Sequence, residues 1–388
     1  MTRAMMDRPP NIRHFAALAA TVRHGSLSRA ARAVNLSQPA LTQAITGLEA
    51  SLGTTLFERG PQGMTPTEAA LLLAPRAEAA IEHIGSSRVT GTQLRAFLAV
   101  VRAGSYSAAA EATGISAASL HRAVADLSVA LGQRLIDRRG RTLVLTPAGE
   151  RRARGFGLAT AELRAGLAEV AALQGKAGGR IAVGAMPLSR ARWLPEVIAR
   201  FIPAHPGVDV AVHEGSHVEL VGPLRDGEID LMLGALREGA RADDLEQEAV
   251  FEDRPALVMR AGHPLLTAAD PASAMFAYPW LLPSAETPLR RYWQDMVLGL
   301  GREVPHVQVE CGSVMMVRQL LLGSDALSLL SPAQVSVELE AGMLAAMPTP
   351  VPVARTIGII TRPGWRPTAA QADFLALLRE VGRQQADE

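Results

Sequence analysis

The sequence predicts a chain of several domains: two small, mainly helical domains in tandem, one long helix, and then an α/β domain. Three observations lead to this fold class. A stretch near the N-terminus occurs twice, with an offset of 79 residues. Residues 147–174 form an unbroken run rich in Ala, Leu, Arg and Glu, which is typical of a long helix. From Arg180 onward, apolar runs alternate with amphipathic ones, as strands and helices do in a parallel α/β sheet.

Length and composition agree with such a chain. Its 388 residues suggest two to four domains, and an apolar content of 48% is enough for full cores. No segment approaches the roughly 18 uninterrupted apolar residues of a membrane span. The N-terminus lacks the apolar region of an export signal, so a cytoplasmic protein without membrane contact is expected. The single cysteine, Cys311, excludes an internal disulfide framework and a cysteine-rich zinc site.

The first copy of the repeat contains the most informative segment, residues 37–48 with the sequence SQPALTQAITGL. Expected helices over 11–24 and 28–34 precede it. Ser37 is a good N-cap and Pro39 suits a first helical turn, so a third helix is predicted to begin here. Its apolar residues recur at helical spacing and predict one buried stripe: Leu41, Ala44, Ile45, Leu48 and Leu52.

The opposite face of this helix carries uncharged hydrogen-bonding side chains. A helix, a tight turn and a helix with a polar exposed face form the helix-turn-helix pattern, whose second helix enters the major groove of DNA. Residues 56–65 then predict a short hairpin, the wing, and residues 67–84 a helix that Pro75 is expected to kink. The candidate DNA contacts of this copy are Ser37, Gln38, Pro39, Thr42, Gln43, Thr46 and, at the base of the wing, Arg59.

The second copy keeps the scaffold and changes the exposed face. The cap serine, the stripe and the turn glycines recur, whereas Gln38, Thr42, Gln43 and Thr46 become Ala117, His121, Arg122 and Ala125. Glutamine suits a bidentate bond to adenine, and arginine most often reads guanine. An alternative is that this copy is a structural spacer, because its alanines make a poor reading face. Its candidate DNA contacts are Ser116, Ser119, His121, Arg122, Arg138, Arg139 and Arg141.

Charge is distributed unevenly along the chain although the net charge is only +1. Residues 1–155 hold 19 Lys+Arg and 10 Asp+Glu, a balance of +9, and the remaining residues hold 20 and 28, a balance of −8. Solvated surface charge is one explanation of such a difference. Beside a helix-turn-helix pattern, a basic N-terminal part favours contact with nucleic-acid phosphates.

Two motifs of the first copy, SQPALTQAITGLE at 37–49 and LGTTLFER at 52–59, resemble the N-terminal winged helix of LysR-type transcriptional regulators. The second copy is less similar, but its LTPAGE at 145–150 runs into a long helix, as in that family. The rest of the chain resembles the family's effector domain, so the resemblance covers nearly the whole sequence. The chain departs from the family in carrying two winged helices where ordinary members carry one.

The resemblance implies two tandem winged helix-turn-helix domains, over 11–84 and 92–146. It implies that residues 147–174 are a linker helix through which two subunits dimerise, although such a helix could also pack on its own chain. The remainder, 180–388, is expected to be a two-lobed α/β domain like a periplasmic binding protein, with lobe I at about 180–254 and 350–388 and lobe II at about 255–349. Expected partners are promoter DNA, a small-molecule effector, RNA polymerase, and further copies of the chain in a homodimer or homotetramer. No cofactor and no metal is expected.

Effector contacts are predicted in the loops that follow the parallel strands, where ligands bind in open α/β sheets. Hydroxyls and backbone N–H groups at helix N-termini there suit an anion such as a carboxylate, although each such residue could be an ordinary N-cap. The segments PEVI at 195–198 and EIDL at 228–231 resemble the branch that senses aromatic-acid or sugar-acid metabolites. Cys311 and the Met315–Met316 pair are assigned to the core. The candidate contacts are Met186, Ser189, Ser216, His217, Ala235, Ser284, Thr287 and Ser313.

Enzymatic functions find no support in a GxSxG elbow or a GK[ST] phosphate loop, because the sequence has neither. Its HExxH match, HEGSH at 213–217, falls in the loop expected after a strand and not on a helix, as a zinc site of that type requires. Two other functions share parts of the pattern. A solute-binding module of the transport type would have the same two-lobed cleft, but two helix-turn-helix patterns argue against it. A structural DNA-binding protein would leave the effector lobes unused. The chain is therefore predicted to be a LysR-type regulator that binds promoter DNA as a homo-oligomer and responds to a small molecule.

Overall fold

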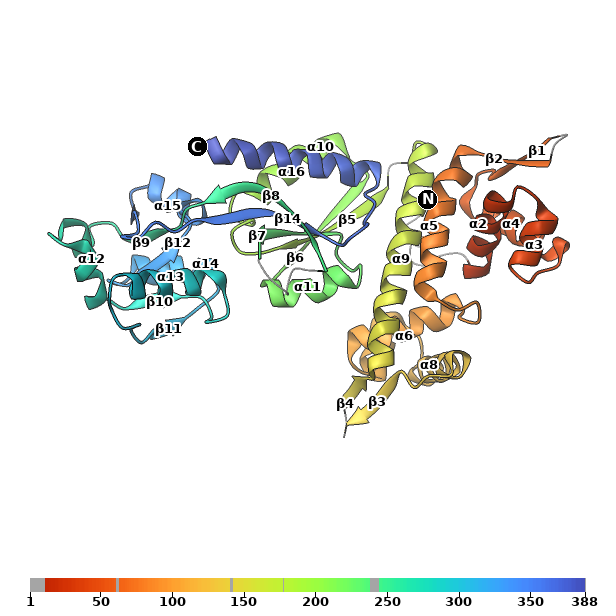
Figure 1. Ribbon diagram of the computed structural model, residues 1–388, viewed down its shortest axis with the longest axis horizontal. Coiled ribbons are helices and arrows are strands. Elements are labelled where there is room, and N and C mark those ends of the chain that lie inside the picture. The colour runs from red at the N-terminus through yellow and green to blue at the C-terminus, as the bar shows by residue number, and fades with distance from the viewer. Residues whose placement is uncertain (1–10, 61–62, 140–141, 177, 238–243, 388) are drawn as a thin grey trace.

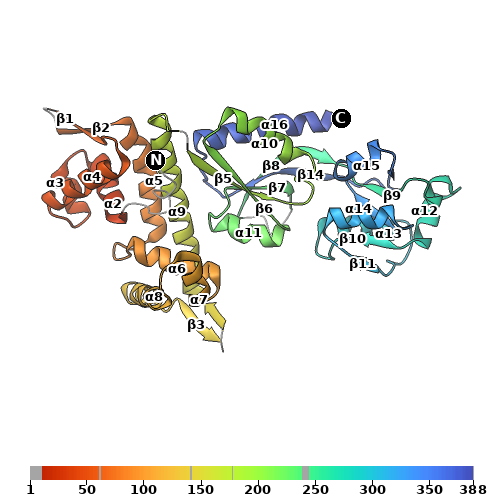
Figure 2. The same ribbon diagram turned by 180° about the vertical axis from the view of Figure 1, so that it is seen from behind.

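A computed structural model describes residues 11–60, 63–139, 142–176, 178–237 and 244–387. Two long helices, α5 (Glu68–Ile84) and α9 (Pro147–Leu173), stand side by side near the middle of the molecule. Two α/β lobes extend from one side of this pair, and the N-terminal helices lie on the other side (Figure 1). The same arrangement is visible from behind (Figure 2).

The first winged unit has three helices and a hairpin. Ser37 accepts a hydrogen bond from the backbone N–H of Ala40 at 3.3 Å, which caps the third helix as expected. Asn35 makes the preceding turn with a left-handed backbone, φ 54°, a conformation that asparagine tolerates. The elements are α2 (Ile12–His24), α3 (Leu27–Ala33), α4 (Gln38–Leu52), β1 (Phe57–Gly60) and β2 (Gly63–Pro66).

The second winged unit repeats this plan. Ser116 caps its third helix by accepting from the N–H of Ser119 at 3.2 Å. Gly114, with φ 69°, stands at the turn position that Asn35 occupies in the first unit. The elements are α6 (Gly91–Ala103), α7 (Tyr106–Thr113), α8 (Ala117–Leu131), β3 (Ile136–Arg139) and β4 (Thr142–Leu145).

A single hydrophobic core joins both winged units to α5 and α9. Phe15 of the first unit, Phe97 of the second and Phe156 of α9 are all fully buried in it. Phe97 and Phe156 meet edge to face, with ring centroids 5.9 Å apart. Helix α5 continues through Pro75 without interruption, and α9 packs against α5 of its own chain.

Lobe I is built on a five-stranded sheet in the order β6-β5-β7-β14-β8. Two separate apolar clusters show that α10 and α16 cover one face of this sheet and α11 covers the other (Figure 1). The last strand of the chain returns to this sheet, as expected. The elements are β5 (Gly179–Ala185), α10 (Trp193–Ala204), β6 (Val208–Glu214), α11 (His217–Arg225), β7 (Leu231–Ala235), β8 (Glu246–Asp253), β14 (Arg355–Thr361) and α16 (Ala369–Asp387).

Lobe II has its own five-stranded sheet, in the order β11-β10-β12-β9-β13. One cluster packs α13 against this sheet and another packs α14 against it. The elements are β9 (Ala256–Arg260), η1 (Pro264–Thr267), α12 (Pro271–Ala274), η2 (Met275–Ala277), β10 (Trp280–Leu282), α13 (Pro288–Gly299), β11 (Val309–Glu310), α14 (Val314–Leu322), β12 (Leu327–Leu330), η3 (Pro332–Val335), α15 (Ser336–Glu340) and β13 (Leu344–Met347).

The sheets differ from the sequence prediction in one respect. Parallel pairing holds for β5, β6 and β7 in lobe I and for β10, β11 and β12 in lobe II. The other two strands of each sheet, β8 and β14 in lobe I and β9 and β13 in lobe II, pair antiparallel. The sheets are mixed because β8 leaves lobe I for lobe II and β14 returns, which brings two strands in from outside the βαβ series.

Candidate functional site

The exposed face of α4 presents the polar side chains that the sequence singled out. Gln38, Pro39, Thr42, Gln43 and Thr46 line one shallow surface hollow together with Gly47 and Ala50. The amide oxygen of Gln38 accepts from the Ser28 hydroxyl at 3.2 Å, and the Thr42 hydroxyl donates to the backbone oxygen of Gln38 at 3.0 Å. No hydrogen bond within the described part of the chain engages the side chains of Gln43 and Thr46. Gln43 is therefore the amide most available to a base edge.

The corresponding face of α8 offers a different set of groups. Ser119, His121 and Arg122 are exposed. The Ser119 hydroxyl accepts from that of Ser116 at 2.9 Å, and the His121 ring lies 5.1 Å from the ring of Tyr106. Arg122 has no carboxylate partner among the described residues, so its guanidinium is free for another acceptor.

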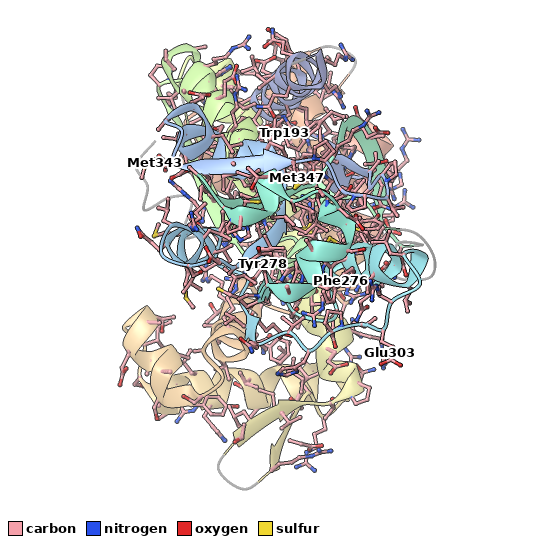
Figure 3. All side chains as sticks on the ribbon, turned by 90° about the vertical axis from the view of Figure 1, so that its left-hand side faces the viewer. Trp193, Phe276, Tyr278, Glu303, Met343 and Met347 are labelled. Carbon is pink, nitrogen blue, oxygen red and sulfur yellow. The ribbon has the colours of Figure 1, made fainter. Side chains whose placement is uncertain are left out.

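The two wings are matched hairpins. Arg59 lies opposite Met64 in β1–β2, and Arg138 lies opposite Leu143 in β3–β4. Arg139 is exposed in β3. Only the backbones of Arg59 and Arg138 are described, and Arg141 lies outside the described residues. Figure 3 looks along the molecule from the end of lobe II, where Phe276 and Tyr278 are labelled, and shows the second winged unit projecting beyond the lobes.

A cavity of about 500 Å³ lies between the two lobes. Lobe I contributes Met186, Ser216, His217 and Ala235 to its lining, and lobe II contributes Ser284 and Thr287. These are six of the eight predicted effector contacts. The hydroxyl of Thr287 also donates to the backbone oxygen of Ser284 at 2.8 Å and caps α13 by accepting from Arg290 N–H.

The other two predicted contacts, Ser189 and Ser313, do not line the cavity. The hydroxyl of Ser189 is fully buried and donates to the backbone oxygen of Met186 at 2.8 Å, where it holds the turn after β5. Ser313 caps α14 by accepting from the N–H of Met316 at 3.4 Å. Both hydroxyls serve local structure, which is the ordinary N-cap or turn role that the sequence left open.

Several lining residues were not predicted, and the core assignment was wrong for Met315 and Met316, which are 75% and 51% exposed. Cys311 packs against the apolar core of lobe II and also lines the cavity. Arg190 directly follows the predicted contact Ser189, and Glu214 stands two residues before the predicted contact Ser216, so a wider window around those contacts would have found both. Arg355, Ser328 and Gln334 come from strands or turns with no local signal. The unpredicted lining residues that carry polar or charged side chains are Arg190, Glu214, Glu219, Arg237, Glu310, Cys311, Ser328, Gln334 and Arg355.

Charges of both signs surround the cavity, and Arg190, Glu214 and Arg355 already form ion pairs. Arg190 forms an ion pair with Glu214. The side-chain amide of Gln247 holds the Arg237 loop by bonding both its backbone N–H and C=O, at 2.9 and 2.8 Å. Hydrogen bonds from Ser216 lower the pKa of Glu219 below its ordinary value, so this carboxylate stays ionised. An anionic ligand would thus have to compete with, or rearrange, these pairs.

A buried ion pair joins the two strands, β8 and β14, that connect the lobes. Arg355 at the start of β14 faces Asp253 at the end of β8, with Nε 2.6 Å from Oδ2. Their side chains are only 10% and 7% exposed. The two crossing strands are thus fastened together at the cavity wall, and removing either partner would leave the other charge buried and unpaired.

The α5–α9 pair meets lobe I through a second group of charges. Arg76 of α5 donates to the backbone oxygen of Arg366 at 2.9 Å, and Arg366 donates to that of Pro75 at 3.2 Å. The second winged unit makes its own contact, an ion pair from Arg102 to Glu228. Two residues along the chain from Glu228, Asp230 is partly buried. Burial raises the pKa of its carboxyl, and bonds from Ala182 N–H and the charges of Arg362 and Arg164 partly offset this.

Two winged helix-turn-helix units joined to a two-lobed domain with a ligand-sized cavity define a ligand-responsive DNA-binding regulator. Residues 12–71 and 92–150 each match the family described as bacterial regulatory helix-turn-helix protein, lysR family. Residues 174–383 match the LysR substrate binding domain. The chain belongs to the LysR family of transcriptional regulators.

Relatives with curated descriptions agree with this family. The chain is 32% identical to the HTH-type transcriptional regulator GalR of Pseudomonas putida, over 97% of this chain and 98% of that protein. It is 27% identical to the HTH-type transcriptional regulator PcaQ of Agrobacterium fabrum, over 77% of this chain and 97% of PcaQ. Both relatives are transcriptional regulators.

A solved structure shows the same fold. A full-length OxyR variant from Pseudomonas aeruginosa aligns with a TM-score of 0.55 at 21% identity, and the alignment covers 75% of this chain and 94% of that one. Within the described residues, no helix is long and apolar enough to cross a membrane. No three His, Cys, Asp or Glu side chains of the described ranges lie together as a metal site would require.

Proposed function

We propose that this LysR-family regulator contacts promoter DNA with both winged units and is switched by a small carboxylate-bearing effector, with aromatic or sugar acids as the leading candidates. The single observation that carries the effector part is the inter-lobe cavity, which hydroxyl groups line from both lobes and guanidinium groups line from lobe I. The regulator acts in the cytoplasm as a homodimer or homotetramer and communicates with RNA polymerase.

The proposed DNA contacts divide between base edges and phosphates. Gln43 and Arg122 are the base readers, because both are exposed and neither has a partner among the described residues. Thr46 and His121 assist them. Ser37, Ser116 and the wing arginines Arg59, Arg138, Arg139 and Arg141 contact phosphates, which positions each helix without reading sequence.

The proposed effector contacts come from opposite walls of the cavity. Ser216 stands at the N-terminus of α11 in lobe I, and Ser284 and Thr287 stand at the N-terminus of α13 in lobe II. The positive ends of two helix dipoles therefore point toward the same space, which favours an anion. Met186, His217 and Ala235 add an apolar and aromatic wall beside them.

The switch is proposed to run from lobe closure to the winged units. A ligand that bridges the lobes favours one angle of β8 and β14, and hence one position of lobe I. Lobe I contacts α5 through Arg366 and the second winged unit through Glu228. A change at the cavity can therefore alter how the winged units sit on DNA, by as much as the ligand's affinity differs between the two states.

Calorimetry on the full chain with a panel of aromatic and sugar carboxylates tests the effector proposal. A carboxylate that binds should also change the mobility or footprint of a promoter complex. In the double variant Ser284→Ala, Thr287→Ala, binding should weaken about tenfold or more while affinity for DNA without effector is kept. The matched control is Ser324→Ala, an exposed lobe II serine whose hydroxyl bonds Leu320 outside the cavity. Wild-type ligand affinity in the double variant would remove this loop from the site.

A further inference from the structure

The two long helices occupy equivalent places in the repeat. The offset of 79 residues maps α5 (Glu68–Ile84) onto residues 147–163, the first part of α9. Thr67 and Thr146 introduce them in the same way: each hydroxyl accepts from an N–H of the following helix, from Ala70 at 3.4 Å and from Gly149 at 3.0 Å. In the same way, α2 packs on α5 and α6 packs on α9. Each winged unit thus has its own long helix.

These equivalent helices pack against one another in antiparallel directions. Arg152 near the start of α9 donates to the backbone oxygen of Ile84 at the end of α5, at 3.0 Å. Farther along, Arg76 of α5 pairs with Glu162 of α9 at 3.2 Å. Residue numbers therefore rise along one helix as they fall along the other, which Figure 1 also shows from the positions of the two wings.

The contacts of this pair are related by an approximate two-fold axis. A Cβ at Gly155 would lie 2.5 Å from the backbone oxygen of His83, so the two helices approach closely there. Adding 79 to 83 gives 162, and subtracting 79 from 155 gives 76. The His83–Gly155 contact and the Arg76–Glu162 ion pair therefore occupy equivalent positions on the two sides of the pair.

Burial shows that the pair is part of the protein core. Arg76 is only 5% exposed, and it bonds Glu169 with two nitrogens, Nη2 to Oε1 at 2.7 Å and Nε to Oε2 at 3.3 Å, besides Glu162. Leu73, Phe156 and Leu163 are buried in the apolar core that both winged units share. The relative position of the two units is thus fixed inside one chain.

We propose that the two winged units form an intramolecular pair, so that a single chain reads two unlike half-sites of an asymmetric DNA element. This rests on the proposed DNA contact of both units. A pair made from two identical chains presents the same face twice and matches a symmetric site. Here one half of the pair presents Gln43 and the other presents Arg122, so one half-site is predicted to carry adenine where the other carries guanine.

The test is selection of binding sites from random double-stranded DNA by the full-length protein, repeated with variants. The wild-type protein should enrich two different motifs at a fixed spacing near a whole number of helical turns. Gln43→Ala should weaken selection at one motif by about 5- to 150-fold, and Arg122→Ala should do so at the other. Arg254→Ala is the matched control, because its side chain is 82% exposed on the distant lobes, and it should leave both motifs unchanged.

The outcomes separate this inference from the proposed function. Two identical motifs that Gln43→Ala weakens equally, with no effect of Arg122→Ala, would mean that first units from two chains do the reading, and the intramolecular pair would be overturned. One short motif alone would overturn it as well. If the protein enriched no motif at all, the proposed sequence-specific binding of DNA would itself be contradicted.

A spacing series on the selected site completes the test. Inserting five base pairs between the motifs rotates them by about half a turn, and inserting ten moves them about 34 Å farther apart, so either insertion should abolish the joint binding. Equal binding at every insertion length would show that the two units are not held at a fixed separation, and would contradict the pair.

Discussion

In the first winged unit, the reading helix α4 buries Leu41, Ala44, Ile45, Leu48 and Leu52, whereas α8 of the second unit buries only Leu120, Val124 and Leu127. The preceding helices differ in the same direction, since two alanines are buried in α3 and one in α7. The caps of the two reading helices and the left-handed turns before them are nonetheless equivalent. Caps and turns thus specify where the helices begin and end, and the number of buried apolar residues sets how stable each winged unit is.

The largest expected effect comes from the contact that ties the two units together. Arg76→Glu would place a carboxylate among Glu162 and Glu169 in a buried position, and should lower the free energy of unfolding by about 3–5 kcal/mol. Chemical denaturation followed by circular dichroism measures this. Arg254→Glu, on an exposed loop, should stay within about 0.5 kcal/mol of wild type. Equal losses in the two variants would remove Arg76 from the stabilising contacts.

A smaller effect should follow from copying one residue of the first unit into the second. Position 149 is glycine where the first unit has Ala70, and a Cβ there would overlap the backbone oxygen of Leu135. Gly149→Ala should therefore destabilise the protein by about 1–3 kcal/mol through overpacking. The reciprocal Ala70→Gly should cost about 1 kcal/mol through helix propensity, in addition to the loss of a fully buried methyl group. A stabilising Gly149→Ala would show that α9 can move away from its wing without loss.

Hydrogen exchange compares the two reading helices directly. The shallower packing of α8 should make its local opening easier than that of α4, by on the order of 1 kcal/mol, so its amides should exchange sooner. Mass spectrometry of peptides from 38–52 and 117–131 in one sample gives both rates. Slower exchange in α8 would mean that contacts outside the apolar stripe hold the second unit.

The smallest effect on stability is expected from copying the reading face of α4 onto α8. Ala117→Gln, His121→Thr, Arg122→Gln and Ala125→Thr, made together, change outward positions and should each shift stability by less than about 0.5 kcal/mol. The second half-site should then come to resemble the first in a binding-site selection. A second motif that stays as it was would mean that α8 does not read bases.

Local signals let the sequence predict the winged units well. Capping serines, an apolar stripe and turn residues act within a few positions of one another, and Ser37 and Ser116 cap α4 and α8 as predicted. The strand β8 was missed because it is an edge strand of lobe I, and its exposed face carries charges that look like a loop. Which long helix packs on which was left open, because that depends on contacts between distant residues.

The cavity likewise contains some residues that local sequence signals predict and others that they do not. Ser216, Ser284 and Thr287 were found because each stands at a helix N-terminus directly after a strand. Arg355 was not found, since it reaches the wall only through the pairing of β14 with β8, and its partner Asp253 lies 102 residues away. Ser189 was misassigned because a hydroxyl in a loop has the same sequence signature whether it faces a ligand or its own backbone.

The pairing of α5 with α9 also bears on how the protein behaves at low abundance. A reader assembled from two subunits loses its second half as the protein is diluted, because the second subunit must be recruited from solution. Here the chain itself supplies the second winged unit at a fixed, high effective concentration. The pair therefore persists at any copy number. Because a substitution in one reading helix leaves the other unchanged, the base preference of each helix can change independently when its own half-site in the promoter mutates.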